Sequence, residues 1–260
     1  MRNNYVQIFL GLYITCVFLA CSSAEDVPRC YDYIRGQTYS NLTIELDTVP
    51  SFAPSVTIRS QVESSLGEVL EKSGGVTVDA DNFLDSVGSN HIWTNASLLS
   101  LAESNYNLEV PANTIKMHTL FVDGAYVSDT NASKTLVLKL NEIHLVVFIE
   151  TIETACTGGI NKALPQVDRE NLCTLLTAGT WLHGLGRLLG LVNDGLPMVG
   201  NHEDLTHKGY SANENSVMHK SFESLPLMER YRDRVLAGNL DVISFDNACI
   251  ADINAVKTGD

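Results

Sequence analysis

The longest helical pattern in the chain constrains its fold more than any other feature. Apolar residues at helical spacing predict a helix from about Arg169 to Leu189, with Asp168 as its N-cap and Gly190 just beyond its end. A long amphipathic helix of this kind has to bury its apolar face against a sheet or against other helices. The chain should therefore contain such a partner layer before or after this segment.

The same patterns predict that partner layer. Alternating or continuous apolar residues predict strands at 42–46, from 76, at 114–122, at 135–140 and at 142–150, and helical spacing predicts a helix over 56–72. Residues 191–221 look irregular, and Pro226 is an early residue of a last helix that ends near Ala237. This order predicts an α/β (α+β) fold, in which a mixed, twisted sheet packs on long helices and an irregular C-terminal subdomain follows the longest helix.

The N-terminus resembles an export signal. Residues 8–20 form an apolar run of about 13 residues, which is too short to span roughly 30 Å of hydrocarbon and is typical of a signal peptide. Cys21 follows Ala20 as in a bacterial lipobox, which predicts lipidation of Cys21; ordinary cleavage after Ala24 is the alternative. We therefore expect a signal peptide over 1–20, a tether over 21–40 and one domain over 41–260, divided into 41–190 and 191–260. The protein should be exported and lipid-anchored in the cell envelope, or else secreted.

Charge and cysteine content limit the partners and the compartment. The chain has 17 Lys and Arg against 31 Asp and Glu, a net charge of −14, and no basic cluster, so nucleic acid is not expected as a partner. In an exported chain, four cysteines remain after the signal and the lipidation site, an even number that predicts two disulfides with three possible pairings. These cysteines are Cys30, Cys156, Cys173 and Cys249.

The most informative motif lies at the end of the long predicted helix. Residues 183–193 read H-G-L-G-R-L-L-G-L-V-N, and Ser216-Val217-Met218-His219 follows. The spacing resembles the metzincin zinc peptidases, whose helix reads H-E-x-x-H-x-x-G-x-x-H and is followed by a methionine turn. The resemblance implies a metzincin-like fold. In that family, three histidines hold zinc, and the glutamate is the general base that takes a proton from zinc-bound water.

This chain keeps the skeleton of the motif and loses its chemistry. His183 occupies the first ligand position, whereas Gly184 occupies the position of the general base. Arg187 and Asn193 replace the second and third histidines, while Gly190 and Met218 keep the turn and the methionine. A guanidinium near the ion would repel zinc by several kcal/mol, on the order of 4 kcal/mol per unit charge at about 4 Å.

The resemblance and its departures together imply a function without hydrolysis. We expect an exported, lipid-anchored pseudopeptidase that binds a peptide or protein partner along the cleft, with the membrane as a second partner through the anchor and with no cofactor. Arg187 should pair with Asp194, Glu203 or Asp204, or hold a carboxylate or peptide carbonyl of a bound chain.

Two alternatives remain open. In the first, the chain is a zinc-dependent metallopeptidase with a rewired ligand set. Its zinc ligands would come from His183, His202, Asp204, His207 and His219. In the second, it is a structural envelope lipoprotein whose cleft is filled by its own side chains.

Overall fold

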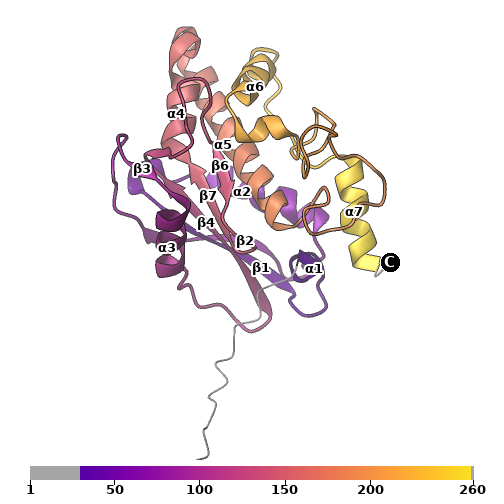
Figure 1. Ribbon diagram of the computed structural model, residues 1–260. Helices are drawn as coiled ribbons and strands as arrows, with labels where there is room; N and C mark the ends of the chain where they lie inside the picture. The colour runs from indigo at the N-terminus through magenta and orange to yellow at the C-terminus, as the bar shows by residue number, and fades with distance from the viewer. Residues whose placement is uncertain (1–29, 259–260) are drawn as a thin grey trace, which may run out of the picture.

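A five-stranded sheet forms the centre of the computed structural model, which describes residues 30–258 (Figure 1). The strands lie in the order β2-β1-β4-β7-β6, and β6 pairs antiparallel with β7 while the other pairs are parallel. The predicted mixed sheet packed on helices is confirmed. The strands are β1 (Asn41–Thr48), β2 (Gly75–Phe83), β4 (Thr114–Val122), β6 (Val137–Lys139) and β7 (His144–Phe148).

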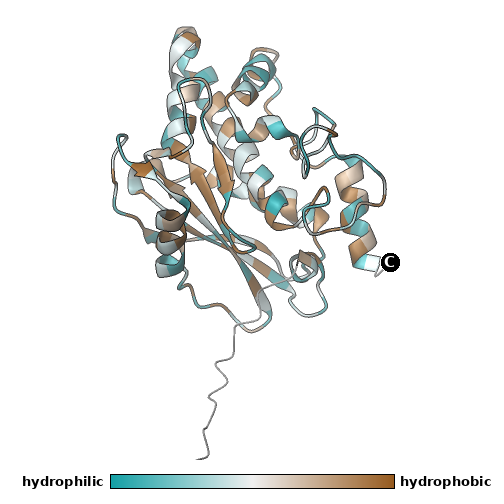
Figure 2. Ribbon diagram, viewed as in Figure 1, coloured by the Kyte–Doolittle hydropathy of each residue, from teal (hydrophilic) through white to brown (hydrophobic). Residues whose placement is uncertain are grey.

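The larger core lies between one face of the sheet and the long helices. Side chains alternate across a strand, so Leu42, Ile44 and Leu46 of β1 all face this core and are fully buried. Trp181 anchors α5 across the sheet by donating a hydrogen bond from Nε1 to Thr119 Oγ1 (3.0 Å). The longer helices that contribute to this core are α2 (Val56–Val69), α4 (Ile149–Thr157), α5 (Gln166–Leu188), α6 (Pro226–Leu236) and α7 (Asn247–Thr258). Apolar residues concentrate on the sheet and on the helix faces that cover it (Figure 2).

A smaller layer covers the opposite face of the sheet. It consists of α3 (Asn95–Asn105) and a two-stranded sheet of β3 (Ile92–Trp93) and β5 (Ala125–Tyr126). Thr94 and Ser97 form a capping box that fixes the start of α3. A second apolar cluster, which includes Leu98 and Val146, holds this layer to the sheet.

The folded domain begins before residue 41, so the prediction of a tether over 21–40 is wrong for residues 30–40. Residues 30–34 form the short helix α1 (Cys30–Ile34), whose Tyr33 and Ile34 are fully buried. Lys72 Nζ fixes this segment by donating hydrogen bonds to the carbonyl oxygens of Asp32 and Arg35 (2.8 and 2.6 Å). The predicted signal peptide over 1–20 and the lipidation site Cys21 lie outside the described residues. The remaining short elements are the 3-10 helices η1 (Pro50–Phe52), η2 (Gly159–Ala163) and η3 (Lys220–Glu223).

Two further expectations need correction. Pro165, rather than Asp168, is the N-cap of α5, and Asp168 lies in the first turn, where its charge favours the positive end of the helix. Among the cysteines of residues 30–258, Cys156 of α4 and Cys173 of α5 form a disulfide, while Cys30 and Cys249 are free thiols, so the prediction of a second disulfide is wrong. In the same part of the chain, no helix is long and apolar enough to cross a membrane.

Candidate functional site

The C-terminal half of α5 places the residues of the motif. His183 is fully buried, and Arg187 follows one turn later on the same face of the helix. Gly190 follows the end of the helix with φ +76°, and a Cβ at this position would lie 2.6 Å from Cys30 Sγ. Both the backbone conformation and the lack of space therefore require glycine here. Asn193 follows in a left-handed conformation (φ 62°), is exposed, and has no described contact with His183.

The segment around Met218 lies beneath the same part of the helix. Met218 is fully buried, and its sulfur packs against Gly186, where there is no room for a Cβ. The residue before Met218 contacts the motif directly: the carbonyl oxygen of Val217 lies 2.7 Å from His183 Nδ1. A carbonyl oxygen only accepts hydrogen bonds, so Nδ1 carries a proton and Nε2 is the nitrogen that faces the cleft.

Glu223, at the end of η3, is the centre of the polar contacts in this cleft. Its Oε1 lies 3.4 Å from His183 Nε2 and 3.4 Å from an Arg187 terminal nitrogen, and it accepts a 2.7 Å hydrogen bond from the Tyr210 hydroxyl. Lys220 forms an ion pair with Oε2. Burial alone would raise the pKa of Glu223, but the contacts with His183, Lys220 and Tyr210 hold it well below its usual range. Glu223 is therefore a permanent carboxylate that neutralises part of the charge beside it.

Arg187 is held by carboxylates and by an aromatic ring. Its Nε donates to Asp194 Oδ2 (3.0 Å), and the guanidinium carbon lies 4.6 Å from the centre of the Tyr210 ring. Burial alone would lower the pKa of Arg187, but Tyr210, Asp194 and Glu223 raise it above its ordinary value. Of the three expected partners, Asp194 pairs with Arg187. Glu203 binds Lys208, and Asp204 binds His207.

The other candidate zinc ligands do not gather around His183 in the structure. His202 pairs with Asp252 (2.7 Å), His207 with Asp204 (2.9 Å), and His219 Nδ1 lies 2.9 Å from Ser221 Oγ. In the described part of the chain, none of these contacts reaches His183. The atoms in the cleft that could bind a metal are His183 Nε2 and the carboxylate oxygens of Glu223. Glu223 already binds two cations, Arg187 and Lys220. This set does not fit a zinc ion, which takes three or four close ligands.

Outside the cleft, residues 30–258 contain two groups whose ligand atoms lie within 4.8 Å of one another: His202 with Asp246 and Cys249, and Glu45 with Asp47 and His118. In the first group, His202 Nδ1 is buried and has no hydrogen-bond partner. Burial raises the pKa of the Cys249 thiol far above its ordinary value, so this sulfur is protonated at neutral pH. No pattern in the sequence joins His202 with residues so far along the chain.

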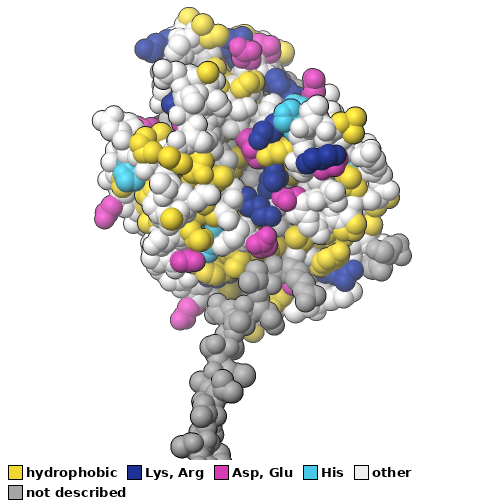
Figure 3. Space-filling model, in the orientation of Figure 1, with side chains coloured by type: hydrophobic (Ala, Val, Ile, Leu, Met, Phe, Trp, Pro, Cys, Tyr) yellow, Lys and Arg dark blue, Asp and Glu magenta, His cyan; other side chains and the backbone are white. Residues whose placement is uncertain are grey.

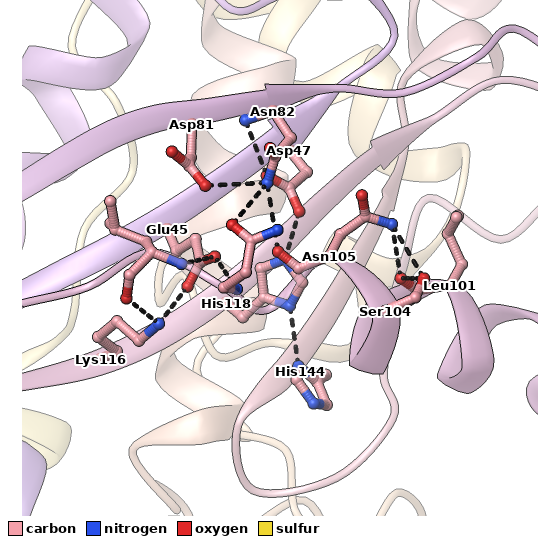
Figure 4. A network of polar contacts seen from close by, with 12 residues as sticks. Glu45, Asp47, Asp81, Asn82, Leu101, Ser104, Asn105, Lys116, His118 and His144 are labelled. Atoms are coloured by element: carbon pink, nitrogen blue, oxygen red, sulfur yellow. Dashed lines mark hydrogen bonds and ion pairs between the residues drawn. The ribbon is translucent and has the colours of Figure 1, made fainter.

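The second group belongs to a buried network on the α3 side of the sheet (Figure 4). His118 lies between Asp47 and His144, with 2.9 Å from Nε2 to the carboxylate and 2.9 Å between the two Nδ1 atoms. Glu45 accepts hydrogen bonds from the backbone of residues 107 and 108 and forms an ion pair with Lys116 (2.6 Å). Because these groups satisfy one another, the network accounts for its own burial without a metal.

A cavity of about 350 Å³ opens beside Arg187. Its floor and walls come from the edge strand β6, from the segment that precedes it, and from the 210–224 region. Four cationic side chains line it, and Lys and Arg gather at the middle of this face of the molecule (Figure 3). These cations are Lys134, Lys139, Arg187 and Lys220.

The sequence points to Arg187 and to its partner Asp194, but not to the other residues that surround Arg187. Lys139, Tyr210, Lys220 and Glu223 match no motif spacing. One signal was available for two of them, because Lys220 and Glu223 follow Met218 within five residues and oppositely charged residues three apart often pair.

Comparison with known proteins gives a structural similarity and no similarity in sequence. No protein-family model matches the chain, and no curated protein matches it in sequence. Among solved structures, the chain is similar to archaemetzincin from Methanopyrus kandleri, with 13% sequence identity and a TM-score of 0.49. The similarity covers 84% of this chain and 96% of that protein.

Proposed function

We propose that this chain is a non-hydrolytic binding protein, a pseudopeptidase with a metzincin-like domain that takes an extended peptide or protein segment into the cleft beside Arg187. One observation carries the proposal: Glu223 Oε1 lies 3.4 Å from both His183 Nε2 and an Arg187 terminal nitrogen, where the motif would place zinc. Zinc hydrolysis needs ligands that hold the ion and a base that takes a proton from the zinc-bound water. The cleft keeps one of the three histidines of the motif, and its carboxylate, Glu223, already binds Arg187 and Lys220.

The position of the general base supports the same conclusion. A Cβ on Gly184 would lie 2.6 Å from both terminal carbons of Leu145 and 2.7 Å from Val137 Cγ2. Gly184 therefore packs directly against β6 and β7, on the face of the sheet that α5 covers, and there is no room for a side chain at this position. A water activated at this site would find no residue of α5 to take its proton.

The edge strand supports peptide binding in particular. β6 pairs with β7 on one side only, and the antiparallel register joins Leu138 to Val146. Because hydrogen bonding alternates along such a pair, the backbone groups of Val137 and Lys139 point toward the open edge, where the cavity lies. An extended peptide can add to this edge as a further strand. A purely structural role with a filled cleft accounts less well for an open edge beside a cavity.

The proposed location is the cell envelope, with the chain exported and anchored through lipid on Cys21. Support comes from the apolar run at 8–20 followed by Cys21, and from the Cys156–Cys173 disulfide, which is typical of an oxidising compartment. Expression with a radiolabelled fatty acid tests the anchor. The label should enter the wild-type chain and be absent from a Cys21→Ser variant, and equal labelling of both would contradict it.

Metal content tests the central proposal. Elemental mass spectrometry of the chain, purified without chelators and dialysed against trace zinc, should find less than about 0.1 zinc per chain at the cleft. His183→Ala and Cys249→Ser variants assign any zinc that is found. Full occupancy that disappears in His183→Ala would overturn the proposal. Occupancy that disappears only in Cys249→Ser would place the metal in the His202 group and leave the cleft as a binding site.

A further inference from the structure

We infer that the segment bound in the cleft is acidic, and that an Asp or Glu side chain of the ligand lies among Lys139, Arg187 and Lys220. This inference rests on the proposed peptide-binding function and names the class of ligand. It depends on three observations: the local charge, the free donor groups, and the position of the cations beside an open strand edge.

The charge of the cleft is opposite to that of the molecule. Four cations and one carboxylate, Glu223, line the cavity. Two more carboxylates pair with these cations from outside the lining, Asp194 with Arg187 and Lys139, and Glu142 with Lys139. The chain as a whole has 31 acidic residues against 17 basic ones. A local excess of positive charge on an acidic protein is not required for folding, and it attracts a negatively charged ligand to this place.

Several donors of these cations have no partner within the described structure. Arg187 uses Nε and one terminal nitrogen in its bonds with Asp194 and Glu223, and none of its described hydrogen bonds involves the second terminal nitrogen. Lys139 Nζ donates to the Arg187 carbonyl oxygen (3.3 Å) and lies 3.6 Å from Asp194 and 4.0 Å from Glu142, both of which are longer than a good hydrogen bond. Lys134 has no described ion pair at all. An incoming carboxylate would find charge-assisted hydrogen bonds that these residues do not already use.

The cations are also within reach of a bound strand. Lys139 belongs to β6 itself, and its side chain is 17% exposed, as is that of Arg187. Lys220 is more open, at 38%. A peptide paired with β6 directs alternate side chains toward the cavity, so acidic residues at every second position meet the cations. Basic residues at those positions would face like charge, which excludes such peptides.

Three fluorescein-labelled octapeptides test the inference, with Thr alternating with Glu, with Gln or with Lys. Fluorescence anisotropy with the full domain at about pH 7 should show the Glu peptide binding about tenfold more tightly than the Gln peptide. The Lys peptide should not bind. Equal affinity for the Glu and Gln peptides would overturn the acidic specificity and leave the peptide-binding proposal intact. Failure of all three peptides to bind would overturn both.

Matched variants place the ligand in the cleft. Lys134→Gln and Lys139→Gln should each weaken binding of the Glu peptide about threefold and leave the weak binding of the Gln peptide unchanged. Lys162→Gln removes the same charge from an exposed residue outside the cavity and should have no effect. An equal loss in all three variants would show long-range attraction only and would overturn the assignment to this cavity.

The last control separates a peptide from a simple anion. Unlabelled Thr-Glu octapeptide should displace the labelled peptide at far lower concentration than inorganic phosphate or free glutamate does. Displacement by phosphate at the same concentration would mean that the cleft binds any anion, and it would overturn the inference that the ligand is a peptide. Urea unfolding of each variant checks that a loss of affinity does not come from a loss of folding.

Discussion

Gly184 stands where the motif places a general base, and its surroundings explain why no side chain is present. Leu145 and Val137 of the sheet lie against the α-carbon closely enough to exclude even a methyl group. We expect Gly184→Ala to lower the free energy of unfolding by about 1–3 kcal/mol, because the extra methyl group overpacks this contact. Urea denaturation of the two proteins measures the difference.

Gly67 provides the matched control, because it lies in α2 and a Cβ added there would meet no atom within 4 Å. Gly67→Ala should raise stability by about 0.5–1 kcal/mol, since alanine restricts the unfolded chain and favours the helix. A Gly184→Ala protein as stable as wild type would show that the helix can move away from the sheet. In that case a glutamate could also be introduced at position 184 as a general base, although the contacts with Leu145 and Val137 leave no room for it in the present structure.

At the scale of elements, three neighbouring strands share one buried network. β1 contributes Asp47, β4 contributes His118, and β7 contributes His144, so the network crosses the middle of the sheet. Burial, then the neighbouring His118 and Lys116, lower the pKa of His144 from 6.5 to about 4. The folded protein therefore keeps His144 neutral at a pH where the unfolded chain would protonate it.

The sign of the pH dependence follows from this shift. The unfolded state binds more protons than the folded state between the two pKa values, so the stabilisation is complete above about pH 6.5 and is lost as the pH falls toward 4. Between about pH 7 and pH 5, wild type should lose about 1–2 kcal/mol more than His144→Gln, measured by urea denaturation. His91→Gln, outside the network, should keep the wild-type slope. An identical slope for His144→Gln would show that His144 does not contribute to the acid sensitivity.

The elements differ in how far sequence could predict them. The long helix and the strands between β1 and β7 that carry apolar runs follow from periodicity, which reports burial of one face. The last helix, α6, follows from Pro226 at its start. α1 is too short to show a period, and its place depends on Lys72 contacting carbonyl groups far along the chain. α7 had a usable signal, since Cys249, Ile253 and Val256 lie at helical spacing and are buried.

The site shows the same limit more sharply. The spacing of α5 places His183, Arg187 and Gly190 without reference to any other segment, and these positions follow from sequence. Their partners lie in irregular chain between 194 and 223, where no period exists, and only the three-dimensional fold brings Tyr210 and Glu223 to the helix. The charge reversal of the cleft is likewise invisible in composition, because it arises from four residues that three separate segments bring together.

At the scale of the whole molecule, net charge and cleft charge have opposite signs, and salt should therefore affect stability and binding in opposite directions. With a net charge of −14, the folded chain repels itself, and salt screens this repulsion. Raising NaCl from about 20 to about 200 mM shortens the Debye length to below about 10 Å and should raise the urea midpoint of unfolding. The same change should weaken binding of the acidic octapeptide, because it screens the cations of the cleft.

The variants from the cleft show whether these two effects are independent. Lys134→Gln removes one cation that has no described ion pair, so it should reduce the salt dependence of peptide binding while leaving the salt dependence of stability almost as in wild type. Lys162→Gln changes the net charge equally, so it should leave the salt dependence of binding unchanged. If both variants altered the salt dependence of binding equally, that dependence would reflect the total charge of the protein and not the cations of the cleft. Since that charge is negative and repels an acidic peptide, such a result would contradict a positively charged binding site at the edge of the sheet.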